Sequence, residues 1–343
     1  MGLPSGPLGI GPAVRRAGPS LLRLAVAVTV LWFLWRRVGA APFKDGLRAV
    51  TWQAVVAAVT LTAVTTVCSA WRWRVVARAL GVGIGLPRAV CAYYRSLFLN
   101  SVLFGGVVGD VHRAVAHGRR AGDVVLGLRA VAWERLCGQV IQAAVTAVVL
   151  LTLPSPVRPA LPYMLAALAG LAGVAGCAAL VVRGTARRGG SRLTRAARAV
   201  SADVRHGLLA SDVWPQLMLA SVLVVAGHTA TFLIAARVAG STAPLGELVA
   251  LLLVVQCVMV IPLSIGGWGL REGAAAWAFG AAGLGAAAGV TVATLYAVLM
   301  LGAVSPGAGL LLTDAVRHRR DQGQLAESRR PDPAPLTMEA ARG

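Results

Sequence analysis

Charge is scarce in this chain, and lysine is almost missing. Only 13% of the 343 residues are charged, whereas 57% are hydrophobic. Soluble domains carry about 25% charged residues, so this balance excludes a soluble globular protein. Because a helix needs about 20 apolar residues to cross a bilayer, the length allows about eight crossings and little room for a soluble catalytic domain. We therefore predict an all-α, polytopic integral membrane bundle of about eight transmembrane helices, with one or two re-entrant or broken helices.

The sequence patterns of common enzyme and metal sites are also missing. The five cysteines stand singly among apolar residues, and no CxxC pair occurs. HExxH, P-loop and nucleophile-elbow patterns are missing as well. On these grounds we expect neither a metal nor a cofactor.

The charge that is present is mostly arginine. The formal net charge is +20, and Lys44 is the only lysine. The arginines lie in short segments between apolar runs, where basic residues set orientation and attract anionic lipid headgroups. We therefore expect the arginine-rich loops to contact an anionic lipid surface, and we expect no nucleic acid partner.

Three segments follow from the composition: a disordered N-terminal segment (1–19), a transmembrane domain (20–313) and a disordered basic tail (314–343). Within the domain, arginines at helical spacing predict an amphipathic cytoplasmic helix at about 187–207. The expected crossings are 20–40, 50–70, 124–153, 161–182, 213–236, 245–263, a short helix after Gly269, and 286–312 with a bend near Ser305.

The arginines also predict an orientation. Arginine-rich segments lie at 71–95, 113–129, 183–205 and 317–330. Placing them inside puts both termini on the cytoplasmic side of the bacterial cytoplasmic membrane, with residues 97–110 entering and leaving on one side. One loop is an exception, because its basic residues fall outside: Arg36, Arg37, Lys44 and Arg48.

Glycine interrupts the apolar pattern twice, once in each half of the chain, at 104–110 and 264–269. Paired interruptions of this kind indicate a substrate site near the membrane midplane in transporters built from repeats. The expected backbone breaks are Gly105, Gly106, Gly109, Ser264, Gly266, Gly267 and Gly269.

A few charged residues remain at membrane depth: Asp110, Arg113, Glu134, Arg135, Arg271 and Glu272. A lone charge there costs about 3 kcal/mol or more, so we expect one network that joins both glycine-interrupted segments through Glu134 and Arg135. Adjacent helical residues diverge by about 100°, so each member of an adjacent pair should find its partner on another element. The alternative is that these pairs sit at the cytoplasmic interface and only hold helices together.

Other polar and aromatic residues have simpler interpretations. Trp71 and Trp73 are typical of interface anchors, and His228 is typical of a hydrogen-bonded packing residue.

Several of these features together resemble a known family. They are Trp71-Arg72-Trp73-Arg74 with Leu80-Gly81, Gly105 to Asp110 with Arg113, Glu134-Arg135, Pro262 to Gly273, and Pro306-Gly307. The chain resembles the lysylphosphatidylglycerol synthase transmembrane region, also called the flippase-like domain family, from about residue 20 to 313.

The resemblance implies a domain that moves lipids between leaflets of the membrane. In the multiple peptide resistance factor, such a domain moves an aminoacylated lipid made by a separate soluble domain. About 30 residues follow the last expected crossing here, so we expect a separate lipid-modifying synthase as a partner. The expected substrate is a phospholipid, aminoacyl-lipid or glycolipid, whose headgroup enters a cleft lined by Arg113, Arg135 and Arg271.

Two alternatives stay open. The first is a membrane-embedded glycosyl- or aminoacyl-lipid transferase, or its partner subunit, with Asp110, Glu134 or Glu272 as the general base. The second is a scaffold or regulator of envelope enzymes.

Overall fold

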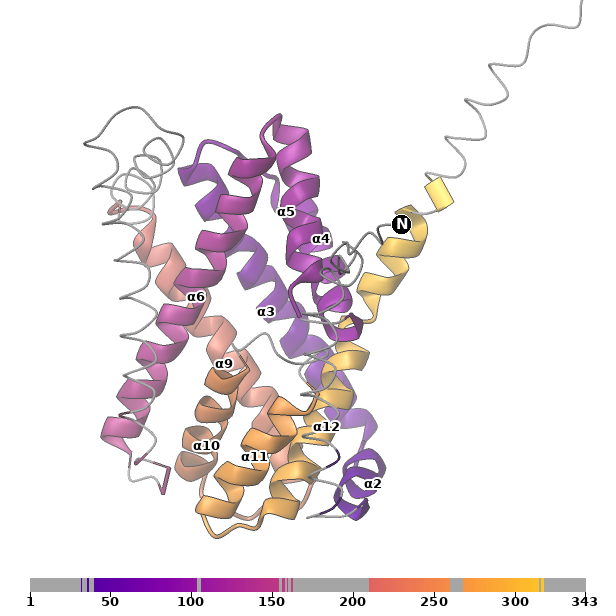
Figure 1. Cartoon of the computed structure of the whole chain (residues 1–343), viewed down its shortest axis with the longest axis vertical. Coiled ribbons are helices and arrows are strands. Elements are labelled where there is room, and N and C mark those ends of the chain that lie inside the picture. The colour runs from indigo at the N-terminus through magenta and orange to yellow at the C-terminus, as the bar shows by residue number, and fades with distance from the viewer. Residues whose placement is uncertain are drawn as a thin grey trace, which may run out of the picture.

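The computed structural model describes residues 40–103, 106–153, 210–259 and 268–314, together with a few single residues outside these ranges. Every regular element among them is a helix, and the helices form one elongated bundle (Figure 1). The predicted all-α bundle is therefore confirmed. The expected segments 1–19, 161–182, 187–207 and 315–343 lie outside the described residues, apart from single positions, and so does nearly all of 20–40.

Long helices form the frame of the bundle. They are α3 (Trp52–Ala79), α6 (Val124–Thr152), α9 (Trp214–Val238) and α12 (Ala286–Val304), and α12 continues past a turn at Ser305 to Asp314. At 1.5 Å per residue each is longer than the hydrocarbon core of about 30 Å. These helices are apolar enough to cross a membrane and match four of the expected crossings, including the bend near Ser305. A shorter helix, α2 (Ala41–Arg48), packs against α12.

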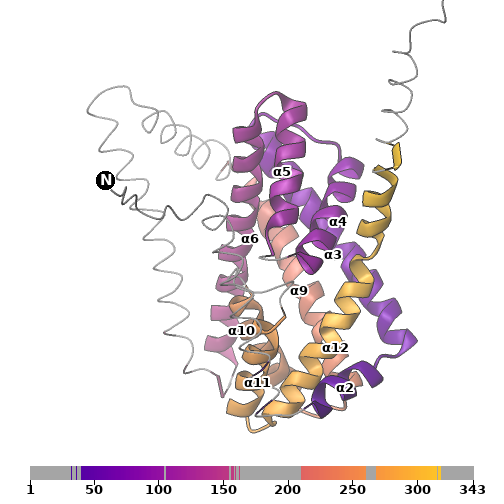
Figure 2. The same ribbon diagram turned by 45° about the vertical axis from the view of Figure 1, so that its right-hand side comes forward.

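A pair of short helices occupies one end of the frame. Helices α4 (Leu86–Val102) and α5 (Val108–Ala121) pack against each other, and the chain turns back between them. Both lie beside the upper ends of α3 and α6 in Figures 1 and 2. The segment that we predicted to be re-entrant is a helical hairpin of α4 and α5.

A second pair occupies the opposite end. Helices α10 (Leu245–Val258) and α11 (Leu270–Ala281) have 14 and 12 residues and pack against each other below α4 and α5 (Figure 2). Their lengths of about 21 and 18 Å are too short for a crossing of about 30 Å. We expected 245–263 to cross and the helix after Gly269 to cross or nearly cross, whereas α10 and α11 are short helices packed against each other, which we call the second hairpin.

Each hairpin builds its own core. Around α10 and α11 the core consists of buried leucine, valine and alanine side chains, with Phe232 and Phe279 at less than 2% exposure. Around α4 and α5 the core contains Trp73 and Tyr93 beside small residues of α3, α5 and α6. The N-terminal ends of α5 and α11 face the middle of the bundle from opposite sides (Figure 2).

Candidate functional site

Glu134 lies at the centre of a group of buried charges. Its Oε1 accepts hydrogen bonds from Arg72 Nε at 2.9 Å and from the Tyr93 hydroxyl at 3.1 Å, while its Oε2 accepts one from Arg113 Nη2 at 2.6 Å. The side chain is fully buried. A buried carboxylate is stable only with such partners, so Glu134 ties α3, α4 and α5 to α6.

Asp110, in the first turn of α5, is the second carboxylate of the group. Its Oδ1 accepts hydrogen bonds from Arg113 Nε at 3.0 Å and Arg135 Nη2 at 2.8 Å. Ser96 and Asn100 of α4 also donate to it, at 3.1 and 3.2 Å. We call the residues Arg72, Asp110, Arg113, Glu134 and Arg135 the Glu134 cluster.

Arg113 is the most enclosed member of the cluster. Its guanidinium carbon lies 4.8 Å from the centre of the Trp73 ring and 4.4 Å from that of Tyr93. Trp73 is fully buried, so its expected role as an interface anchor is wrong. The tryptophan instead covers a buried cation, an arrangement that favours arginine over lysine.

The turn between α4 and α5 is fixed by its polar and glycine residues. Asn100 Oδ1 accepts a hydrogen bond of 2.7 Å from the amide of Gly109, and Gly106 has a φ of +60°. A Cβ on Gly109 would lie within 3 Å of the Ser96 backbone. Gly106 and Gly109 therefore supply the expected break and close approach, while Gly105 lies outside the described residues.

Arg271 and Glu272 form a separate pair at the start of α11. Arg271 donates to Glu272 Oε1 through Nε at 3.1 Å and Nη2 at 2.9 Å. Glu272 Oε2 accepts from the amide of Gly269 at 2.7 Å, and Gly269 has a φ of +87°. The expected divergence holds for Glu134 and Arg135 but is wrong here. Ser264, Gly266 and Gly267 lie outside the described residues.

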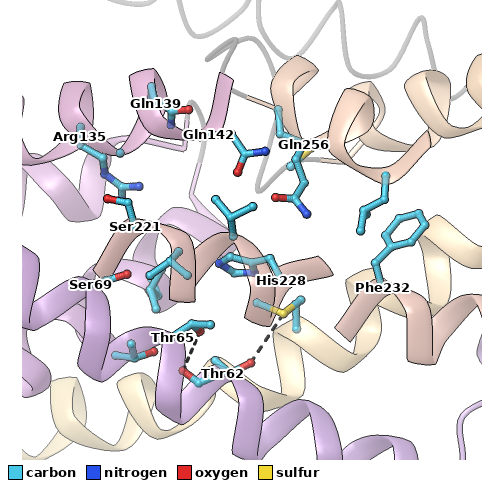
Figure 3. Close-up of a pocket in the computed structure, with 18 of the residues that line it drawn as sticks. Thr62, Thr65, Ser69, Arg135, Gln139, Gln142, Ser221, His228, Phe232 and Gln256 are labelled. Atoms are coloured by element: carbon cyan, nitrogen blue, oxygen red, sulfur yellow. Dashed lines mark hydrogen bonds between the residues drawn. The ribbon is translucent and has the colours of Figure 1, made fainter. Parts of the chain in front are cut away.

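A cavity of about 310 Å³ lies between the Glu134 cluster and the Arg271–Glu272 pair. Arg72 and Arg135 line it from one side and Arg271 from the other. Figure 3 shows Gln142, Gln256 and His228 converging on its middle. The single charge network that we expected is therefore two ion clusters, and the cavity connects them.

The three arginines that we expected to line the cleft do not all reach the cavity. Arg135 and Arg271 line the cavity, whereas Arg113 lies in the Glu134 cluster and is not among the lining residues. Arg72 takes its place in the lining, and the sequence analysis missed it. His228 is hydrogen-bonded as expected, with Nδ1 3.2 Å from the Tyr296 hydroxyl, but it also lines the cavity.

The missed arginine had a visible signal. Thr62, Thr65, Ser69 and Arg72 are spaced by three or four residues and therefore share one face of α3. All four line the cavity. A polar stripe on an otherwise apolar crossing indicates a face that does not meet lipid.

The sequence profile of the lysylphosphatidylglycerol synthase TM region matches residues 20–306. The chain belongs to this family. The matched range contains both helical hairpins, the Glu134 cluster and the cavity between them. Membership of the lysylphosphatidylglycerol synthase TM region and the long apolar helices together make the chain a multi-pass membrane protein with a lipid-related function. No curated protein matches the chain.

Proposed function

We propose that the protein moves a lipid between the leaflets of the cytoplasmic membrane. The lipid headgroup would enter the cavity, and its acyl chains would stay in the bilayer. The observation that carries this proposal is the placement of Arg72, Arg135 and Arg271 around one cavity, two of them from the Glu134 cluster and the third from the start of α11. A headgroup that passes from one side to the other would exchange one set of arginines for the other.

Arg135 is the cluster member best placed to meet a headgroup. Its side chain is 36% exposed, whereas that of Arg113 is fully buried. Arg135 Nε has no hydrogen-bond partner although it is buried. A buried donor without a partner is costly, so a headgroup oxygen at this position would be bound favourably.

The ends of the bundle differ in charge, which supports the proposed orientation. Exposed arginines gather where α4 and α5 meet the surface: Arg78, Arg88, Arg119 and Arg120. Among the residues that the structure describes, the opposite end carries fewer basic side chains, Lys44, Arg48 and Arg237, and Asp45 and Glu247 partly offset them. Under the positive-inside rule the α4–α5 end would be cytoplasmic.

The proposal can be tested with purified protein in vesicles. A phosphatidylglycerol with a fluorescent acyl chain reports its transfer to the outer leaflet, where a membrane-impermeant reductant quenches it. Arg135→Gln and Arg271→Gln should each slow transfer about tenfold or more, because a hydrogen bond to a charged group contributes about 1.5–3 kcal/mol.

Arg119→Gln is the matched control, because Arg119 is an exposed arginine of α5 outside the cavity. It should transfer lipid at the wild-type rate. Thermal melting of each variant in detergent separates a lost site from a lost fold. Unchanged transfer in both cavity variants would contradict the proposal.

A further inference from the structure

We infer that the headgroup accepted by the cavity is a phosphodiester that carries a hydroxyl-rich group and no amine. This inference rests on the proposed lipid translocation and narrows its substrate class. It depends on three observations: the net charge of the two ion clusters, the hydroxyl and amide side chains that line the cavity, and the arginines that already stack on tyrosine rings beside it.

The first observation is a surplus of one positive charge. Among the residues that the structure describes, Arg72, Arg113, Arg135 and Arg271 are paired with three carboxylates, those of Asp110, Glu134 and Glu272. None of the described residues that line the cavity carries a carboxylate. A buried surplus charge is costly, and a phosphodiester with a single negative charge would neutralise it.

The second observation is that many uncharged polar side chains line the cavity. Hydroxyls and amides from α3, α6, α9 and α10 line the cavity: Thr62, Thr65, Thr66, Ser69, Gln139, Gln142, Ser221 and Gln256. Two of them keep unpartnered buried atoms, Thr66 Oγ1 and Gln256 Nε2, and Thr66 is only 1% exposed. A polyol both donates and accepts hydrogen bonds, so it would satisfy these groups better than an acyl chain.

The size of the cavity agrees with a headgroup of this kind. Its volume of about 310 Å³ lies at the lower end of the range of about 300–1,000 Å³ that is usual for small-molecule pockets. This space suits a phosphate with one sugar-sized polyol. It is too small for the acyl chains as well, so they would remain in the bilayer.

The third observation argues against an amine. An ammonium group needs a carboxylate or an open aromatic face. Arginine guanidinium groups already lie against two aromatic rings that line the cavity, Arg113 and Arg135 against Tyr93 and Arg271 against Tyr296. The ring of Phe232, which also lines it, packs against Tyr296. A lysyl or ethanolamine headgroup would therefore bring a second cation beside arginines without a partner of its own.

Four lipids with the same fluorescent acyl chain separate these requirements in the vesicle assay. Phosphatidylinositol has both phosphodiester and polyol, phosphatidylmethanol keeps the phosphodiester but lacks the polyol, glucosyl-diacylglycerol lacks the phosphate, and lysyl-phosphatidylglycerol adds amines. Phosphatidylinositol should move at least tenfold faster than the glucosyl and lysyl lipids. Equal or faster movement of the lysyl lipid would overturn the inference.

Thr66→Val tests the hydroxyl-rich part of the headgroup. Losing one hydrogen bond of about 1 kcal/mol should slow phosphatidylinositol about fivefold and leave phosphatidylmethanol unchanged. Thr60→Val is the matched control, because Thr60 is an exposed residue of the same helix and bonds only to the carbonyl of Val56. An equal loss for both lipids in Thr66→Val would contradict the assigned polyol contact.

Binding in detergent distinguishes this inference from the proposed function. Short-chain phosphatidylinositol should raise the melting temperature more than short-chain lysyl-phosphatidylglycerol does. Selective binding without movement would disprove translocation and support the headgroup class, whereas binding without selectivity would disprove the class. If the soluble headgroup glycerophosphoinositol bound as tightly as the lipid, the headgroup class would stand and a lipid substrate would be excluded.

Discussion

Glu134 and Arg72 lie on different long helices and form an ion pair in which neither side chain is more than 6% exposed. Arg113 binds the other oxygen of the same carboxylate. The pairing therefore determines both where α6 meets α3 and how the α4–α5 hairpin sits against them. Arg72 could not turn toward the cavity in this way without Glu134 to hold it.

Removing the charge of Glu134 should destabilise the protein strongly. Glu134→Gln leaves Arg72 buried without its carboxylate and leaves Arg113 with Asp110 alone, and breaking a buried pair costs about 3–5 kcal/mol. The free energy of unfolding, measured by denaturant titration in mixed micelles, checks this.

Glu247→Gln is the control, because Glu247 lies in the first turn of α10 away from the cluster. The control should lose no more than about 1 kcal/mol, the usual effect of a charge at a helix N-terminus. A similar loss of unfolding free energy in both variants would show that the Glu134 cluster does not contribute more to stability than a single surface charge.

Tyr93 contributes both a hydroxyl and a ring to the cluster. Tyr93→Phe removes the hydrogen bond to Glu134 but keeps the ring beside Arg113, so it should cost about 1–2 kcal/mol. Tyr93→Leu loses the ring as well and should cost at least a further 1 kcal/mol or so from the cation–π contact. Tyr94→Phe, on the partly buried neighbour, serves as the control and should melt like the wild type. Equal melting of the phenylalanine and leucine variants at position 93 would argue against the ring contact.

The sequence predicted the long helices well because their ends carry local signals. Helix α6 begins at Val124, where the Asp123 side chain accepts a hydrogen bond from the Leu126 amide at 3.0 Å. It ends at Thr152, just before a proline-rich turn. Capping and proline act within a few residues, so one sequence reveals them.

The second hairpin could not be predicted in the same way. The apolar stretch 245–263 is long enough for a crossing, yet α10 ends at Val258. Hydropathy records which residues avoid water, but it does not record whether they meet lipid or other helices. Packing against α6, α9 and α11 decides the position of α10, and the contacts with α6 are distant in the sequence.

The sequence predicted the partners of the buried charges only in part, because the direction of a side chain depends on its place in the helix. Midway along a helix, neighbours such as Glu134 and Arg135 diverge, and each finds a partner elsewhere. At the start of α11, Glu272 turns back toward the free amide of Gly269, and the long Arg271 side chain follows it. An N-terminal turn has unpaired amides, and these change which direction a carboxylate takes.

Gly109 should be essential for closure of the α4–α5 hairpin. A Cβ there would come within 3 Å of three backbone atoms of Ser96, which cannot move aside as a side chain can. Gly109→Ala should therefore cost about 1–3 kcal/mol or more by overpacking.

Gly302→Ala in α12 is the control, because no atom lies within 4 Å of its Cβ position. It should be neutral or stabilising by up to about 1 kcal/mol, as expected for alanine in a helix. The melting temperatures in detergent should move in opposite directions, and a parallel shift would contradict the close approach.

Gly138→Ala should impair function more than stability. A Cβ at Gly138 would lie 2.8–2.9 Å from the guanidinium atoms of Arg72, the flexible end of a side chain that can shift. The shift would weaken the 3.1 Å hydrogen bond from Arg72 to Ser221 and move the guanidinium within the cavity. We expect lipid transfer in vesicles to slow about tenfold, and the melting temperature to fall less than in Glu134→Gln, because Arg72 is displaced but keeps Glu134 as its carboxylate partner. Ser221→Ala removes the same hydrogen bond without adding a methyl group on α6, so it separates displacement of Arg72 from loss of its partner. If Gly138→Ala transferred lipid at the wild-type rate, the position of Arg72 beside α6 would not matter for transport.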